Sequence, residues 1–469
     1  MRLVVEALTE GQLKAVHRAT LDLLARHGIA IHHAPSRQIF EQHGATVDGE
    51  MVKIPEKLIE EALHTAPASF SVIGRNPART ISIGQQYAPV FGPAAGPVYV
   101  TDLGGGRRPA RLEDLRNFLA LAQSSEHIGV VAAGLLEPND LPRKGKHLTV
   151  MMETVKLSDK PIIGLSLGKE VSEDCIAMAY IATEGAGQYY LFGIVNTLSP
   201  MAWDEKMLEA IWAYAGKNQP LVITCCSMAG FTSPTTLAAT LVQNNAEVLA
   251  GVVLAQLINP GTPVVYGNTS TTTDMLSMNL CIGAPEYAIL STAFAQLARC
   301  YGLPFRSGGG LTDAKEVDAQ AGIEAATNLI FTMANNVDFV LHTIGIMESF
   351  LSISYEKWIM DEEICGRNMR MCQGIGELPA TAVELIGKVG PGGYYLDQDD
   401  TLLNWKGTFF RPQVSDRSNW DGWLTKNKTF QQRAQEIWMK RLENFVPPEL
   451  SLAVDAELKE YIDRSPNKG

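Results

Sequence analysis

The centre of the chain carries three short apolar runs in succession, Tyr190-Leu-Phe-Gly-Ile-Val, Pro220-Leu-Val-Ile-Thr-Cys and Pro263-Val-Val-Tyr-Gly-Asn. Each run is long enough for a strand and too short for a helix, and none alternates apolar with polar residues. Strands have this composition when helices cover both faces of their sheet. Residues 190–268 therefore predict parallel strands that are joined by helices.

The same pattern continues on both sides of this stretch. Further apolar runs begin at Gly129, Pro161, Pro304 and Phe339, and the spacing of roughly 30 to 40 residues is the length of one βα unit. Val98-Tyr-Val, before the first of them, gives eight candidate strands. Such strands can close as a barrel or lie open as a doubly wound sheet, and periodicity does not choose between them. Eight units favour an α/β fold of the (β/α)8 TIM-barrel type.

Two smaller segments flank the predicted barrel, which we place at residues 88–395 as the catalytic body. Residues 1–87 predict an α+β cap, with a helix that ends at Gly28, a short strand, a second helix and a hairpin around Asn76-Pro77. The alternation stops in residues 396–469, which predict a helical extension. Its tryptophans offer apolar surface beyond the barrel and predict a homo-oligomer; they are Trp405, Trp420, Trp423 and Trp438.

Composition excludes several classes of protein. The 469 residues are 46% hydrophobic and carry a formal net charge of −12, which is unlike a disordered chain or a nucleic-acid-binding surface. No apolar run approaches the roughly 20 residues of a membrane-spanning helix, and Met1-Arg-Leu-Val-Val-Glu has no signal-peptide pattern. We expect a soluble cytoplasmic protein with neither nucleic acid nor membrane as a partner. Reduced core thiols are expected at Cys175, Cys225, Cys226, Cys281, Cys300, Cys365 and Cys372.

Chemistry in such a barrel is expected where strands meet loops at their carboxyl ends. His342 ends the last predicted strand, Asn196 has the equivalent place four strands earlier, and Asn268 ends a strand between them. Position alone fits a core histidine bonded to a backbone carbonyl as well as a binding residue. Asn196 could equally be a turn residue, although its amide can donate to an anion.

Aromatic residues near the same ends could form a cage around a quaternary ammonium group. Such a group has no proton to donate, so aromatic faces and a nearby negative charge hold it. Glu348 is the candidate charge. The candidate cage residues are Tyr99, Phe350, Phe91 and Tyr266. Helix packing would explain much of the same aromatic content.

Other reaction types have weaker support in the sequence. Gly308-Gly-Gly lacks the spacing of phosphate-binding loops, which favours a close approach of backbone to a ligand or a tight turn. The histidines have no metal-ligand spacing, and no GxSxG elbow is present. A lyase or aldolase on this barrel would need a Schiff-base lysine at a strand end. Lys156 and Lys160 instead lie just before the third predicted strand.

Longer motifs resemble the trimethylamine methyltransferase family. They are Phe305-Arg-Ser-Gly-Gly-Gly-Leu-Thr-Asp, Gly345-Ile-Met-Glu-Ser and Ser354-Tyr-Glu-Lys, with Leu8-Thr-Glu-Gly-Gln-Leu and Val47-Asp-Gly-Glu-Met near the start. That family has a TIM-barrel fold. Its trimethylamine-specific members carry pyrrolysine near the end of the eighth strand, where this chain has His342-Thr-Ile-Gly. The resemblance therefore implies the pyrrolysine-free branch, whose members act on quaternary amines such as glycine betaine.

The resemblance also implies a division of labour. A methyl group would pass from a betaine to Co(I) of a separate corrinoid (cobalamin) protein, so this chain would bind no cofactor tightly and supply no nucleophile. His342 and Asn196 would hold the betaine carboxylate, and relatives assemble as trimers or hexamers. A quaternary nitrogen leaves as a neutral tertiary amine, so no general acid is needed. The alternatives are a sensor that binds a betaine without transfer, and a lyase or aldolase.

Overall fold

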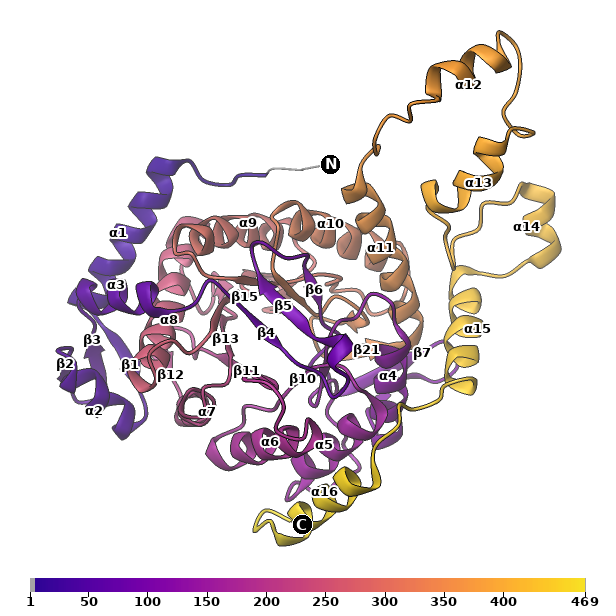
Figure 1. The fold of residues 1–469 in the computed structure, drawn as a ribbon. Coiled ribbons are helices and arrows are strands. Elements are labelled where there is room, and N and C mark those ends of the chain that lie inside the picture. The colour runs from indigo at the N-terminus through magenta and orange to yellow at the C-terminus, as the bar shows by residue number, and fades with distance from the viewer. Residues whose placement is uncertain (1–4, 469) are drawn as a thin grey trace.

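The computed structural model describes residues 5–468, so the expectation drawn from Met1–Val4 lies outside it. Eight parallel strands form a barrel wall (Figure 1) in the order β6-β19-β18-β15-β13-β11-β10-β9. Phe91 bridges to Ile128, and Gly129 N donates to Phe91 O at 2.9 Å, which closes the sheet. The predicted TIM barrel is confirmed. The strands are β6 (Val90–Phe91), β9 (Val131–Ala132), β10 (Ile162–Ile163), β11 (Leu191–Asn196), β13 (Leu221–Cys225), β15 (Val264–Asn268), β18 (Phe305–Gly308) and β19 (Phe339–Leu341).

One of the eight predicted strands is wrong. Val98-Tyr-Val does not enter the barrel, because β7 (Tyr99–Asp102) pairs with β8 (Gly106–Pro109) and with β21 (Ser352–Ser354) in a separate sheet that also holds β20 (Ile346–Met347). The barrel uses β6 instead. That strand has two residues between Pro89 and Gly92-Pro93, too few to give a pattern in the sequence.

Helices form the outer ring of the barrel (Figure 1). Helix α8 is long and apolar enough to span a membrane by length and composition, but 78% of its most apolar window is buried. It packs against β13 and β15 on one side and against the cap on the other, as a core helix does. The ring is α4 (Leu112–Ser124), α5 (Lys146–Leu157), α6 (Lys169–Ala182), α7 (Glu205–Gly216), α8 (Leu237–Ile258), α9 (Pro285–Cys300), α10 (Ala319–Ala334) and α11 (Tyr355–Gln373).

The cap contains every predicted element and, besides the 3-10 turn Pro77–Arg79 inside the hairpin, one more helix and two more strands. The predicted ones are α1 (Glu10–Arg26), β1 (Ile29–Ile31), α3 (Glu56–Thr65) and the hairpin of β4 (Ser69–Val72) and β5 (Ile81–Gly84). The additional ones are α2 (Ala34–Gln42), β2 (Thr46–Asp48) and β3 (Met51–Lys53). Strand β1 also pairs with β12 (Ala202–Trp203), which lies in the barrel loop after β11. The cap is therefore joined to the barrel by a shared sheet.

The chain after α11 divides into a projecting part and a packed part. Residues 375–412, here called the arm, stand away from the barrel in Figure 1 and contain α12 (Ala382–Val389) and α13 (Asp399–Thr408), neither of which has a buried residue. The chain returns through α14 (Trp420–Lys426), α15 (Phe430–Glu443) and α16 (Leu452–Arg464). Trp438 of α15 stacks on Tyr355 of α11, with ring centroids 4.5 Å apart.

The cysteines only partly match the expectation of core thiols. All seven are free, and Cys175, Cys225 and Cys365 are buried. Cys300 is exposed, because it ends α9 on the outside of the ring. The other three are partly buried: Cys226, Cys281 and Cys372.

Candidate active site

A cavity of about 310 Å³ opens at the carboxyl ends of the barrel strands. Its polar wall contains Asn196 from β11, Arg306 from β18 and His342 directly after β19. Among the described residues that line it, none is Asp or Glu. The apolar wall includes Ile163, Leu165, Leu167, Ile194, Met207 and Phe350. This size and mixed lining are typical of a site for a small molecule.

Arg306 is a buried cation without a counter-ion in the cavity wall. Its side chain is 1% exposed, and Nη1 donates to Asn268 O at 3.2 Å and to Thr269 Oγ1 at 3.1 Å. Its Nε has no hydrogen-bond partner. Burial lowers the pKa of the guanidinium, yet arginine stays charged in proteins. Because a buried charge is costly unless it is paired, this wall is built to receive an anion.

His342 presents a neutral N–H donor to the same cavity. Its Nδ1 accepts a hydrogen bond from Ala95 N at 3.2 Å, so a neutral ring carries its proton on Nε2. Burial, and then the charge of Arg306, hold the pKa of His342 well below its usual value. The ring nitrogen Nδ1 bonds to a backbone N–H, so the backbone-carbonyl bond expected of a core histidine is not the one that this nitrogen makes.

The loop that carries His342 is strained. His342, Glu348, Ser349 and Phe350 have φ of 54°, 52°, 52° and 75°, in the left-handed region. Each such residue costs about 1–3 kcal/mol, and the conformation persists only where the surroundings enforce it. Contacts with residues outside the loop must therefore hold it in this conformation.

A buried ion pair on α11 holds this loop. Lys357 Nζ lies 2.6 Å from Asp361 Oδ2 and donates to Gly310 O at 2.9 Å, while Asp361 Oδ2 accepts from Gly345 N at 2.8 Å. The pair thus ties the loop after β18 to the loop after β19. A side chain at position 310 would place its Cβ 2.3 Å from Thr343 O. The glycine run thus allows two loop backbones to approach closely, whereas the sequence predicted a close approach to a ligand or a tight turn.

A second buried carboxylate fixes the loop that follows Asn196. Glu247 on α8 accepts from Ser199 Oγ at 2.6 Å, from Thr197 Oγ1 at 2.8 Å and from Met201 N at 2.8 Å. These bonds hold the turn between β11 and β12. Asn196 itself is exposed in the cavity wall, so its amide is available to a ligand.

Three of the predicted site residues come together. His342, Asn196 and Phe350 line the cavity, with the rings of His342 and Phe350 4.8 Å apart. Glu348 lines a separate cavity of about 430 Å³. There it accepts from Arg107 Nε at 2.8 Å, and that guanidinium lies 3.5 Å above the ring of Tyr99. Glu348 and Tyr99 therefore both contact Arg107, and neither side chain lines the barrel cavity where a ligand would bind.

The remaining three predicted residues belong to the barrel wall. Tyr266 is fully buried and donates to Asn245 on α8 at 2.8 Å, so its ring points toward the helices. Asn268 also turns toward α8, and Phe91 is buried in β6 opposite Val340. Among the described lining residues, Phe350 is the one Phe, Tyr or Trp. The predicted aromatic cage is not assembled around this cavity.

Arg306 is a charged residue of the cavity wall to which the sequence gave no role. It lies within the run Pro304-Phe-Arg-Ser-Gly, in a strand whose neighbours are buried on both faces. Arginine is almost never fully buried without a partner. A single charge inside an otherwise apolar barrel strand was therefore the available signal.

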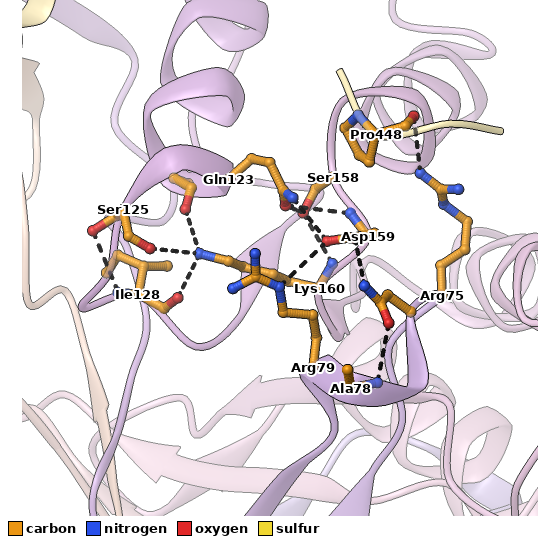
Figure 2. A network of polar contacts seen from close by, with 12 residues as sticks. Arg75, Ala78, Arg79, Gln123, Ser125, Ile128, Ser158, Asp159, Lys160 and Pro448 are labelled. Atoms are coloured by element: carbon orange, nitrogen blue, oxygen red, sulfur yellow. Dashed lines mark hydrogen bonds and ion pairs between the residues drawn. The ribbon is translucent and has the colours of Figure 1, made fainter. Parts of the chain in front are cut away.

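Lys160 does not support a Schiff-base enzyme (Figure 2). It precedes β10, so it lies at the amino ends of the strands, opposite the cavity. Its Nζ donates to the carbonyls of Ala122, Ser125 and Ile128 at 2.7, 2.9 and 2.7 Å, where α4 ends. Burial lowers its pKa to about 7. The adjoining void of about 10 Å³ has no room for a substrate, so Lys160 stabilises a helix terminus.

Comparison with known proteins identifies the family of the chain and relatives with a similar fold. The family model described as Trimethylamine methyltransferase (MTTB) matches residues 2–469. A glycine betaine methyltransferase of Desulfitobacterium hafniense is 42% identical, over 97% of this chain and 96% of the relative. A proline betaine:corrinoid methyltransferase of Eubacterium limosum is 34% identical, over 82% of each. Monomethylamine methyltransferase of Methanosarcina barkeri has a similar fold, with a TM-score of 0.55, 11% identity and coverage of 95% and 90%.

Proposed function

The chain belongs to the trimethylamine methyltransferase family, and we propose that it moves one methyl group from a betaine to the corrinoid of a separate protein. The observation that carries the proposal is the unpaired guanidinium of Arg306 in the cavity wall. Glycine betaine and proline betaine, the substrates in the names of two relatives, share a carboxylate and a quaternary nitrogen. Glycine betaine is the first substrate to test, because that relative is the more similar of the two.

In this proposal the carboxylate of the betaine pairs with Arg306. The Nε2–H of neutral His342 and the amide of Asn196 are the further donors in the same wall. A desolvated carboxylate needs such donors, and charge-assisted bonds of this kind are the stronger ones. Fixing one end of a small substrate directs its methyl groups toward the cavity mouth.

The cavity treats the ammonium end differently. Among the described lining residues there is no carboxylate, and Phe350 is the one Phe, Tyr or Trp. The positive charge on nitrogen disappears as the carbon–nitrogen bond breaks, because the nitrogen keeps the electron pair and leaves as a neutral tertiary amine. A site that held the cation tightly would stabilise the substrate more than the transition state. A cavity wall that binds the ammonium group only weakly favours an enzyme over a betaine sensor.

The corrinoid of the partner supplies the nucleophile. A cavity of about 310 Å³ admits a betaine but cannot enclose a corrinoid ring. The corrinoid therefore approaches from outside, and this chain binds the substrate, orients it and keeps water from the apolar wall. No proton donor is required, in agreement with a neutral His342.

Methyl transfer tests the proposal directly. The chain is incubated with glycine betaine, proline betaine or carnitine and with a cobalamin-loaded corrinoid protein reduced to Co(I). The tertiary amine is measured by mass spectrometry. Product is expected with at least one betaine and only when the corrinoid is present. Tight betaine binding without any demethylation would favour the sensor and contradict the proposal.

His342→Ala and Asn196→Ala are each expected to weaken transfer from glycine betaine while the melting temperature stays nearly unchanged. Losing a donor to a charged group costs about 1.5–3 kcal/mol, or roughly tenfold to a hundredfold in kcat/KM. Tetramethylammonium has no carboxylate and should be much less affected. Equal losses with both substrates, or wild-type kcat/KM with the betaine, would remove these residues from the carboxylate site.

We also propose that the arm mediates homo-oligomerisation, as a trimer or hexamer. Leu396, Leu402 and Leu403 of the arm are 84%, 70% and 76% exposed. Neither α12 nor α13 has a buried residue, so their exposed apolar side chains need a surface to cover them. Light scattering should give a multiple of 51.0 kDa, and Leu402→Glu with Leu403→Glu should lower that mass. Leu452→Glu on α16, 88% exposed, is the matched control; a wild-type monomer would refute the proposal.

A further inference from the structure

A small sheet stands beside the mouth of the cavity. Strands β14 (Met228–Ala229) and β16 (Thr271–Thr273) pair in parallel, and β17 (Leu280–Cys281) pairs with β16 in antiparallel fashion. The sheet is built from the loops that follow β13 and β15. These loops begin at the cavity itself, because Cys226 and Thr269 line it.

Four large apolar side chains on these two loops face solvent. Phe231, Met275, Leu276 and Met278, here called the rim patch, are 61%, 60%, 98% and 47% exposed. The two loops touch, since a Cβ on Gly230 would lie 3.0 Å from Met275 Sδ. Single exposed apolar residues are ordinary, whereas a contiguous group marks a docking surface, and methionine is over-used on such surfaces.

The rim patch is displayed by an ordered turn. Asp274 accepts from Leu276 N at 3.0 Å and from Ser277 Oγ at 2.7 Å, and Asp274 N donates to Asn279 O at 2.9 Å. The exposed position of Leu276 is therefore fixed by the hydrogen bonds of the turn and does not result from local disorder. A surface arranged in this way is ready for a partner without reorganisation.

We propose that the rim patch is the docking surface for the corrinoid protein, an inference that rests on the proposed function. The partner must bring its cobalt to the cavity, and the rim patch stands on loops that form the cavity wall. Two further apolar side chains extend the border, Leu167 and Leu198, at 54% and 49% exposure. A second copy of the chain seated here would obstruct a macromolecular partner, and the arm offers the copies a separate apolar surface.

Leu276→Glu tests this surface, since a side chain that is 98% exposed contributes little to folding. Binding of the cobalamin-loaded corrinoid protein is measured by biolayer interferometry, without turnover. We expect its affinity to fall at least about tenfold, as for a residue central to an interface. The Kd for glycine betaine by calorimetry and the rate of methyl transfer to free Co(I) cobalamin should stay at wild-type values. Val446→Glu, at a residue 81% exposed after α15, is the matched control and should bind normally.

The outcomes separate the two proposals. Unchanged affinity in both Leu276→Glu and the double variant Met275→Glu/Leu276→Glu would overturn the docking surface. A fall in oligomer mass for Leu276→Glu would assign the patch to a second copy and overturn it as well. Loss of betaine binding to the same extent as corrinoid-protein binding would also count against it. The proposed function fails on a different measurement, the absence of tertiary amine with the wild-type chain.

Discussion

Arg306→Met is expected to abolish most betaine demethylation without destabilising the protein. Truncating one partner of a buried charge pair costs about 2–5 kcal/mol, or roughly 30-fold to 4,000-fold in kcat/KM. The free energy of unfolding should hold steady or rise, because the variant loses a buried cation that has no carboxylate partner among the described residues of the cavity wall. Rates with glycine betaine and urea unfolding curves measure the two effects.

Two comparisons make the Arg306 result specific. Wild-type protein should melt at a higher temperature with glycine betaine present, whereas Arg306→Met should not, since stabilisation by a ligand follows its affinity. Tetramethylammonium should be demethylated by both, because it has no carboxylate. Arg306→Lys keeps the charge without the planar fork and should fall between them. Wild-type betaine kinetics in Arg306→Met would show that the carboxylate binds elsewhere.

Asp361→Ala is expected to cause the largest loss of stability. It leaves Lys357, which is 0% exposed, without its counter-ion, and removing one partner of a buried pair costs about 3–5 kcal/mol. It also frees Gly345 N, so the strained loop that carries His342 loses a tether. Urea unfolding measures the first effect and betaine kcat/KM the second.

The double variant Lys357→Met/Asp361→Leu separates stability from positioning. Apolar side chains of similar size should recover much of the folding free energy. The bonds to Gly310 O and Gly345 N stay lost, so betaine transfer should remain impaired. If the single variant Asp361→Ala unfolds at the wild-type urea concentration, the pair does not hold the two loops.

The barrel could be predicted because the composition and the regular spacing of its strands are visible in the sequence. Seven of the eight predicted strands hold, and the exception shows the limit of the method. Strand β6 has only two residues. Val98-Tyr-Val has the stronger β pattern, but its strand pairs with β8 and β21 outside the barrel. Pairing partners far apart in the chain decide such cases, and a local pattern does not contain them.

The site was predicted less well for a different physical reason. A strand buried on both faces has no polar alternation, so the sequence does not say which residues point into the barrel. Tyr266 and Asn268 point toward α8, although Asn268 ends β15 next to the cavity. Arg306 was visible only as a charge in an apolar run. His342 and Asn196 reached the cavity because they stand where strand becomes loop.

The described residues that line the cavity include no Asp or Glu, and this bears on the direction of the reaction. A tertiary amine is neutral when it forms, and His342 is neutral and cannot protonate it there. The amine acquires its proton only in bulk water, where most of it then exists as an ammonium ion. That ion has no free electron pair with which to take the methyl group back. At neutral pH, protonation of the released amine by the surrounding solvent therefore favours demethylation over the reverse methylation, although none of the described residues that line the cavity is a carboxylic acid.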